Sequence, residues 1–321
     1  MKASVNFLLL LTFFSAACNQ SPSAQKKKIP VIGYLDMVED ETLAKARIGF
    51  FDALETEGFS EKEKTLKVIY TNAQGDIPAL GQAADMLISQ QVDLIASNTT
   101  LATITAVQRT KTIPVCMMVA PRPDIAGLTD KNGNTPSNLF GVYETLEYID
   151  TAISIINIFK PGAQRLGTLY NQSEPQSRDA FARLEQQCKV YGWELFSLPV
   201  NNSSETQLAT AALLRKKPDV FFALPDNVIF ASFETIVKLC NDNNIPVFTS
   251  EAGLTARGAV ASFGADFYEW GFQAGMQAAA FLKNPSTKKP LPEIVFKRTR
   301  IFNSEAALRF GIKADSTFVA L

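Results

Sequence analysis

Histidine is absent from all 321 residues of the sequence. Its absence excludes Ser-His-Asp and Cys-His catalysis, histidine general bases and histidine-ligated metal sites. Phosphate-binding glycine loops are missing as well, because the chain contains neither G-x-G-x-x-G nor G-x-x-x-x-G-K-[ST]. We therefore expect no cofactor, and a glycosyltransferase-like or other nucleotide-using enzyme is the less favoured alternative.

Cysteine is scarce, with four residues, and none has the paired C-x-x-C spacing of zinc or redox sites. Cys116, Cys188 and Cys240 lie in apolar or helical runs, so we expect buried free thiols and no metal. An excess of charge of one sign is lacking too, since 31 Lys and Arg stand against 32 Asp and Glu. A nucleic-acid-binding protein would carry a basic excess, so we expect no nucleic-acid partner.

A hydrophobic run long enough to span a membrane is also lacking. The short apolar run from Val5 to Phe14 follows Lys2 and precedes small residues, so residues 1–17 are predicted to be a secretory signal peptide. Cys18 then resembles the lipidated cysteine of a bacterial lipobox, although Ser15 stands where leucine is usual. Residues 18–28 are predicted to be a lipidated flexible tether, which anchors an otherwise soluble protein in the bacterial cell envelope. The alternative is a plain secretion signal.

The rest of the chain alternates short apolar strands with helical segments. Strands are predicted at residues 30–36, 66–70, 93–96 and 114–119, and helices at residues 43–57 and 79–90. The 321 residues are 46% hydrophobic, which is enough for two ordinary domains. Alternating strands and helices predict an α/β fold with helices on both faces of a parallel sheet.

Five landmarks of the first half recur in the same order in the second half, at offsets between 126 and 134 residues. They are Gly33 and Gly167, Gly58 and Gly192, Asp76 and Glu205, Asp93 and Asp219, and the segments Ile113–Val115 and Ile245–Val247. The pattern predicts two copies of one α/β unit, with a cleft where the carboxyl ends of the two sets of strands face each other. A ligand held there would favour a closed form without any catalytic group.

Several segments together resemble a known family. They are GFFDALETEGF (49–59), YTNAQGD (70–76), VDLI (92–95), GTLYNQSEPQS (167–177), PDN (225–227), IPVFTSE (245–251) and RGAVASFGADFYEWGFQAG (257–275). The chain is thereby similar, over residues 29–313, to the ABC-transporter substrate-binding proteins of the tryptophan/tyrosine type. That family has the type I periplasmic-binding-protein fold, in which two Rossmann-like parallel-sheet lobes are joined by a three-strand hinge.

The resemblance implies where the lobes begin and end. Lobe I would comprise residues 29–142 plus 263–293, and lobe II residues 143–262 plus 294–321. The hinge strands would lie near residues 141–144, 261–264 and 293–296, and the helix 267–283 would return to lobe I. Composition alone predicts a single boundary near residue 143.

One segment departs from the family. Where many members have T-D-P after the fourth strand, this chain has Ala120-Pro121-Arg122-Pro123. A hydroxyl and a carboxylate are therefore missing beside the expected ligand, so the ligand is not necessarily a plain aromatic amino acid. Arg122 would meet a second anionic group or, as we favour, solvent.

Polar residues at strand ends are the candidate ligand contacts. Hydroxyls and free N–H groups at helix N-termini suit a carboxylate, although the same residue types serve as ordinary caps. Asp226 is the favoured partner of an ammonium group and Glu251 the second candidate, with helix capping and a surface salt bridge as the respective structural alternatives. The full set is Met37, Asn98, Thr99, Thr100, Ala120, Tyr143, Gln172, Ser173, Glu174, Ser177, Asp226, Asn227, Glu251 and Phe263.

These features predict a monomeric, non-enzymatic solute receptor. It would capture an amino acid or a related amphoteric molecule and deliver it to an ABC permease and its ATPase. The alternative is a lipoprotein that presents its ligand to a membrane sensor kinase, and the sequence does not separate the two.

Overall fold

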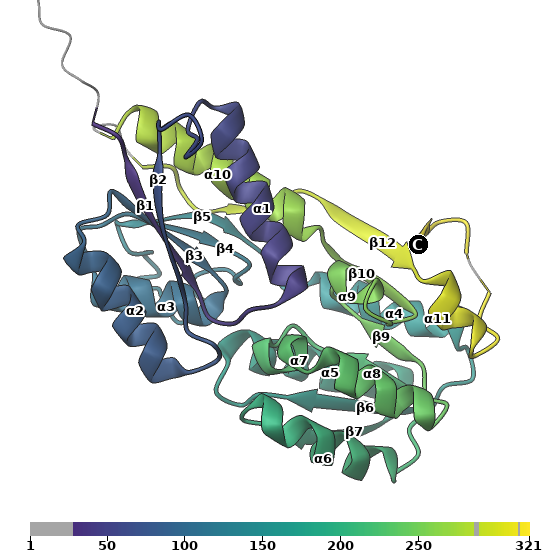
Figure 1. The fold of residues 1–321 in the computed structure, drawn as a ribbon. Coiled ribbons are helices and arrows are strands. Elements are labelled where there is room, and N and C mark those ends of the chain that lie inside the picture. Colours follow the sequence, from purple (N-terminus) through teal and green to yellow (C-terminus); the bar gives the residue numbers. More distant parts are fainter. Residues whose placement is uncertain (1–27, 286–288, 314) are drawn as a thin grey trace, which may run out of the picture.

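The computed structural model describes residues 28–285, 289–313 and 315–321. The predicted signal peptide, Cys18 and nearly all of the predicted tether lie outside these residues. The described chain forms two lobes side by side, each built on its own sheet (Figure 1). This confirms the predicted α/β fold with two parallel-sheet lobes.

Lobe I contains a six-stranded sheet with the order β11-β5-β4-β3-β1-β2. All of its pairings are parallel. Its strands are β1 (Val31–Asp36), β2 (Lys67–Asn72), β3 (Leu94–Asn98), β4 (Val115–Met118), β5 (Leu139–Tyr143) and β11 (Glu293–Ile294). Its helices are α1 (Glu41–Thr56), α2 (Ile77–Ser89), α3 (Thr100–Arg109) and α10 (Phe267–Lys283).

Alternate residues of these strands pack into two different cores, one on each face of the sheet. Ile32 and Tyr34 of β1 pack with α1 and α10 on one face, whereas Leu35 packs with α2 and α3 on the other. The period of two between the faces is that of a pleated strand. Both faces are covered, which explains why the strands read as continuous apolar runs.

Lobe II contains a seven-stranded sheet with the order β13-β12-β10-β9-β8-β6-β7. It is parallel except where β10 and β12 run antiparallel. Its strands are β6 (Arg165–Tyr170), β7 (Glu194–Pro199), β8 (Val220–Ala223), β9 (Val247–Thr249), β10 (Ala261–Ala265), β12 (Arg298–Phe302) and β13 (Val319–Ala320). Its helices are α4 (Tyr148–Phe159), α5 (Pro175–Tyr191), α6 (Ser203–Leu214), α7 (Asn227–Ala231), α8 (Phe233–Asp242), α9 (Ala252–Thr255) and α11 (Ser304–Leu308).

The predicted repeat has a structural counterpart in the first strand of each lobe. A Cβ on Gly33 would lie 2.8 Å from Leu87 of α2, and a Cβ on Gly167 would lie 2.5 Å from Leu213 of α6. Both glycines therefore let a helix approach the sheet closely, which explains why the same residue stands at both positions.

Matching carboxylates also join neighbouring strands in the two lobes. Asp93 accepts a hydrogen bond from the N–H of Val31 at 2.8 Å, and Asp219 accepts one from the N–H of Arg165 at 2.9 Å. The offset of the two acceptors is 219 − 93 = 126 residues and that of the two donors is 165 − 31 = 134, both inside the predicted range.

One landmark of the repeat was paired wrongly. Asp76 caps α2 by accepting from the N–H of Ala79, but the residue that caps α6 is Asn202. Glu205 instead lies in the first turn of α6 and accepts from Asn201 and Asn202. The match with Asp76 failed because acidic side chains are common both at the N-cap of a helix and three residues later in its first turn, so the sequence alone does not tell the two positions apart.

The chain passes between the sheets three times. It leaves the lobe I sheet after β5, returns from the lobe II sheet after β10, and leaves again after β11 (Figure 1). The helix α10 therefore packs in lobe I against α1, far from it in sequence. As predicted, the thiols of Cys116, Cys188 and Cys240 are free and buried.

Candidate functional site

A cavity lies between the lobes. Its volume is about 30 Å³, the space of two or three water molecules. Both lobes contribute side chains to its wall, which consists of Leu43, Thr99, Thr100, Val119, Ala120, Pro121, Leu146, Tyr148, Gln176, Pro225, Asn227, Phe230, Glu251, Phe267 and Trp270. The cavity lies at the carboxyl ends of both sets of parallel strands, where open α/β sheets place their ligands.

On the lobe I side, the N-terminus of α3 meets the cavity at Thr99 and Thr100. Thr99 takes the N-cap position without a side-chain cap, at φ 87° and ψ 162°. Its Oγ1 is buried and has no hydrogen-bond partner within the described chain. A free hydroxyl beside the free N–H groups of a helix start is suited to bind an anion such as a carboxylate.

On the lobe II side, the carboxyl group of Glu251 meets the cavity directly after β9. The side chain is buried, and its Oε1 accepts hydrogen bonds from the hydroxyl of Tyr148 at 2.7 Å and that of Ser250 at 3.0 Å. Burial raises the pKa of Glu251 to about 7, and the nearby charge of Glu144 adds to the rise. A buried carboxyl without a cationic partner gains from a cation brought by a ligand.

A second polar group of lobe II combines the start of α5 with the loop after β8. Glu174 is buried, and its Oε2 accepts from the backbone N–H and the side-chain amide of Asn227, both at 3.1 Å. The side-chain amide of Gln176 also donates to this oxygen. Gln176 and Asn227 line the cavity, so Glu174 holds two lining residues from behind.

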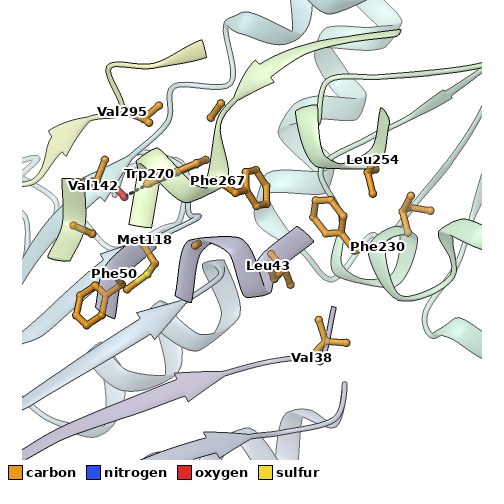
Figure 2. Close-up of a cluster of buried hydrophobic side chains, with 14 of the residues drawn as sticks. Val38, Leu43, Phe50, Met118, Val142, Phe230, Leu254, Phe267, Trp270 and Val295 are labelled. Atoms are coloured by element: carbon orange, nitrogen blue, oxygen red, sulfur yellow. Dashed lines mark hydrogen bonds between the residues drawn. The ribbon is translucent and has the colours of Figure 1, made fainter. Parts of the chain in front are cut away.

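The remaining wall is apolar and aromatic. Figure 2 shows Phe230 of lobe II pointing toward Phe267 of α10, with Leu43 of α1 beside them. The rings of Phe230 and Phe267 are 6.1 Å apart, edge to face. The indole N–H of Trp270 donates to the carbonyl of Val142 at 2.8 Å, which fixes the ring that lines the cavity. Such a wall suits an aromatic or aliphatic ligand group.

One ion pair joins the lobes near the cavity. Arg257, which follows α9 in lobe II, donates to Oδ2 of Asp40 in lobe I at 2.5 Å. Oδ1 of Asp40 caps α1 through the N–H groups of Thr42 and Leu43. Gly253 of α9 stands so close to Thr42 that an added Cβ would lie 2.1 Å from its methyl group. The two lobes are therefore in tight contact here.

Five of the residues predicted from the sequence line the cavity. They are Thr99, Thr100, Ala120, Asn227 and Glu251. Ala120 and the neighbouring Pro121 give the wall apolar surface at the segment where the resemblance implies polar residues in many members. Arg122 points elsewhere, because its guanidinium forms a bidentate pair with Asp124 at 2.6 and 2.9 Å and is half exposed.

Asp226, the favoured ammonium partner, makes different contacts from the predicted ones. Its Oδ1 caps α7 through the N–H groups of Val228 and Ile229. Its Oδ2 accepts from the N–H of Asn171 at 2.7 Å and from the hydroxyl of Ser177 at 2.6 Å. Both oxygens are occupied and neither Asp226 nor Ser177 lines the cavity, so the capping alternative describes Asp226, whereas Glu251 lines the cavity.

The other predicted residues also stand off the wall. Met37 is part of the lobe I core, and Asn98 donates to Asp36 and to the carbonyl of Leu43. Gln172 and Ser173 are exposed, while Tyr143 and Phe263 are partly buried against the cores of lobes I and II. Strand-end position alone does not say which side of the loop faces the cleft.

Sequence reasoning missed most of the apolar wall and Gln176. Tyr148, Phe230, Phe267 and Trp270 lie in helices, where aromatic residues at helical spacing are expected in a core. Gln176 lies in the same helix start as the predicted Glu174 and Ser177, so the capping pattern already led to its neighbourhood.

The chain belongs to the ABC transporter substrate-binding protein family, whose model matches residues 28–320. Members are extracytoplasmic binding proteins and not enzymes, which agrees with the prediction. The assignment also favours delivery to an importer over presentation to a sensor kinase. Within the described residues, no cluster of metal-ligating side chains occurs and no helix is long and apolar enough to cross a membrane.

Among curated proteins, a tyrosine-binding protein of Clostridioides difficile is 31% identical over 295 residues, which cover 92% of this chain and 84% of the relative. A conserved domain protein from Vibrio cholerae has a crystal structure similar to this one, at a TM-score of 0.84 and 25% identity. The alignment covers 91% of this chain and 99% of that chain.

Two further structures differ in how well their shape matches. A domain from Streptococcus pneumonia in complex with L-Trp has a TM-score of 0.83 at 22% identity. The ligand-free, open structure of a substrate-binding protein from Clostridium difficile has a TM-score of only 0.66 at 27% identity. Each covers 91% of this chain, and this chain covers 99% of each. These structures confirm the two-lobed fold of this chain.

Proposed function

We propose that the protein captures an amino acid with an aromatic side chain between its lobes and delivers it to an ABC importer. The observation that carries the proposal is an acceptor and a donor site on opposite lobes, with apolar wall between them. Glu251 of lobe II offers a buried carboxyl group, and the start of α3 in lobe I offers the Thr99 hydroxyl and free N–H groups. An amino acid carries one group for each.

The proposed binding mode assigns each part of the ligand. The carboxylate accepts from the start of α3, and the ammonium group donates to Glu251. The aromatic side chain packs against Phe230, Phe267 and Trp270. One relative is a tyrosine-binding protein and a similar structure is a complex with L-Trp, which supports an aromatic amino acid as the ligand.

The cavity of about 30 Å³ is too small for such a ligand without movement of the lobes. We therefore infer that the lobes part to admit the amino acid and close around it. Closure is favoured only to the extent that the ligand binds the closed form better than the open form. The charged groups of the ligand need partners from both lobes, and only the closed form supplies both partners at once. The proposed binding mode therefore gives the closed form the higher affinity.

The sequence pattern of residues 1–28 supports a proposal for how the protein is attached. We propose that Cys18 carries the lipid, that residues 18–28 form the tether, and that the protein acts as a monomer. We also propose that the lobes meet one to three residues after the predicted boundaries of 142, 262 and 293, because β5 and β11 belong to the lobe I sheet as far as Tyr143 and Ile294, and β10 belongs to the lobe II sheet as far as Ala265.

The test is calorimetric titration of the protein with L-tyrosine and L-tryptophan as a function of pH. Only ionised Glu251 pairs with an ammonium group, and its pKa is about 7. Binding is therefore expected to be strongest above pH 7 and to weaken by about tenfold for each pH unit below 7. Tyr148, Ser250 and Glu144 are the groups that face Glu251, and the carboxylate of Glu144 is held by Arg298 in a bidentate ion pair.

The variant Glu251→Gln is expected to bind at least about tenfold more weakly at pH 8 and to lose the pH dependence between pH 5 and 7. The matched control is Glu194→Gln, an exposed acid on β7 of the same lobe, which should bind like the parent. A Glu251→Gln variant that keeps the parent's affinity and pH profile would exclude the proposed ammonium site.

A further inference from the structure

The residues around Gln176 fix the orientation of its side-chain amide. The residue is 7% exposed and lines the cavity. Its Nε2 donates to Oε2 of Glu174, whereas its Oε1 is buried and has no partner among the residues that the structure describes. A buried carbonyl oxygen without a donor loses the hydrogen bonds that water would give it.

The orientation of this amide follows from Glu174. Oε2 of Glu174 already accepts from the backbone N–H and the side-chain amide of Asn227. Burial and the charge of Asp226 raise the pKa of Glu174. A proton on this carboxyl belongs on Oε1, because the two donors of Asn227 point at Oε2, whereas Oε1 accepts only a long hydrogen bond of 3.4 Å from the side-chain amide of Asn171. In either protonation state Oε2 accepts, so Nε2 of Gln176 turns toward it and Oε1 turns away.

Gln176 and Glu251 belong to separate parts of the wall. Gln176 follows β6 and Glu251 follows β9, with β8 between them in the sheet. Neighbouring strands lie about 4.8 Å apart, so the two segments leave the sheet about 10 Å apart. The hydrogen-bond partners of Glu251 are Tyr148 and Ser250, and those of Gln176 are a different set. An ammonium group held by Glu251 therefore meets a different part of the wall from the part that Gln176 forms.

We propose that Gln176 is a specificity-determining residue, whose side-chain carbonyl selects ligands that carry a hydrogen-bond donor at the end remote from their ammonium group. Glu174 is the positioning residue that fixes the amide. The proposal rests on the proposed function and names the ligand class more closely: a phenol or indole donor is accepted, and its isostere without the donor is rejected. A site that leaves a buried polar group unpaired discriminates strongly against such an isostere.

The test compares two ligand pairs by calorimetry. L-tyrosine is paired with L-phenylalanine, and L-tryptophan with 3-benzothienyl-L-alanine, in which sulfur replaces the indole N–H. The parent protein is expected to prefer the donor-bearing member of at least one pair by about tenfold or more. Gln176→Met keeps the length of the side chain but removes the acceptor, so the preference should fall to within about threefold of unity.

The matched control is Gln172→Met, which changes an exposed glutamine of the same segment and should keep the parent's preference. A thermal unfolding curve for each variant shows whether it folds. The absence of a preference in the parent protein for either pair overturns the proposal without need of any variant.

Two other outcomes also overturn it. If Gln176→Met weakens both members of a pair equally, Gln176 contacts the ammonium or carboxylate group. If it leaves the preference unchanged, another residue reads the donor. In both cases amino acids still bind, so the proposed function stands. If no amino acid binds the parent protein, the proposed function and this inference fall together.

Discussion

Three residues of the cavity wall hold a backbone conformation that L-residues rarely adopt. Thr99, Val119 and Leu146 have φ values of 87°, 49° and 64°. The first two are β-branched, for which a positive φ is least favourable. Such strain costs about 1–3 kcal/mol for each residue and is retained where the surrounding structure enforces it, often at ligand sites. The wall of this cavity is shaped at the expense of stability.

Thr99→Gly is expected to stabilise the ligand-free protein and to weaken binding. Glycine adopts the φ of 87° without strain, which offsets its own entropic cost and gives a net gain of about 1 kcal/mol. The ligand meanwhile loses the hydroxyl. Thermal unfolding and calorimetry measure the two effects, and Lys217→Gly, an exposed positive-φ position away from the cavity, is the control. Lower stability together with unchanged affinity would contradict the assignment.

At this scale the sequence predicts residue types better than roles. Thr99, Asn227 and Glu251 were predicted from their positions after strands, and they line the cavity. Asp226 was predicted by the same reasoning, yet it caps α7. A cap and a ligand contact need the same side chains at the same strand ends, so only three-dimensional packing separates them.

Among the elements, the crossing of α1 and α10 sets the shape of the lobe I wall. An added Cβ on Gly271 would lie 1.8 Å from the carbonyl oxygen of Ala46, and one on Gly49 would lie 2.0 Å from that of Tyr268. The two helices therefore touch backbone to backbone. Leu43 of α1 and Trp270 of α10 reach the cavity from this crossing.

Gly271→Ala is expected to destabilise the protein by about 1–3 kcal/mol, because the helices must separate to admit the methyl group. The melting temperature should fall by several degrees. Gly162→Ala is the matched control, since an added Cβ there meets nothing within 4 Å. A Gly271→Ala protein that melts with the parent would show that the crossing is looser than described.

The sequence pattern and the family resemblance together predict the elements well. The residues of α10 were predicted as a helix from Phe267 to Lys283, and the structure has the same bounds. Its place in lobe I was implied by the family resemblance alone, because nothing in the helix itself names α1 as its partner. The predicted helix at residues 43–57 begins at Glu41 in the structure, since Asp40 caps it.

At the scale of the whole molecule, the ion pair of Arg257 and Asp40 joins the two lobes beside the cavity. The guanidinium also pairs with Glu234 and donates to the carbonyl of Phe230, which holds it in lobe II. Asp40 is held in lobe I as the cap of α1. Because both partners are fixed and mostly buried, the pair forms without much loss of side-chain entropy and favours the closed arrangement.

Arg257→Met and Asp40→Asn are each expected to speed ligand dissociation by about tenfold. Asparagine caps helices as well as aspartate does, so α1 should be preserved in the second variant. Stopped-flow displacement measures the rate, and the double variant should add little to either single change. Arg109→Met, which breaks an exposed pair with Asp85, is the control. Unchanged dissociation in both variants would show that the pair does not hold the lobes together.

The three passages between the sheets have a consequence for synthesis and export. Phe140 packs against Phe281, and the thiol of Cys116 donates to the carbonyl of Ala274, so one face of the first sheet is completed by a helix from near the end of the chain. A polypeptide that stops before α10 leaves the part of that face that α10 covers exposed to water, with α1 alone packed on it. The first lobe to be made is therefore complete only when the C-terminal segment arrives. Until then, a chain that is being translocated contains no lobe with all of its strands and helices.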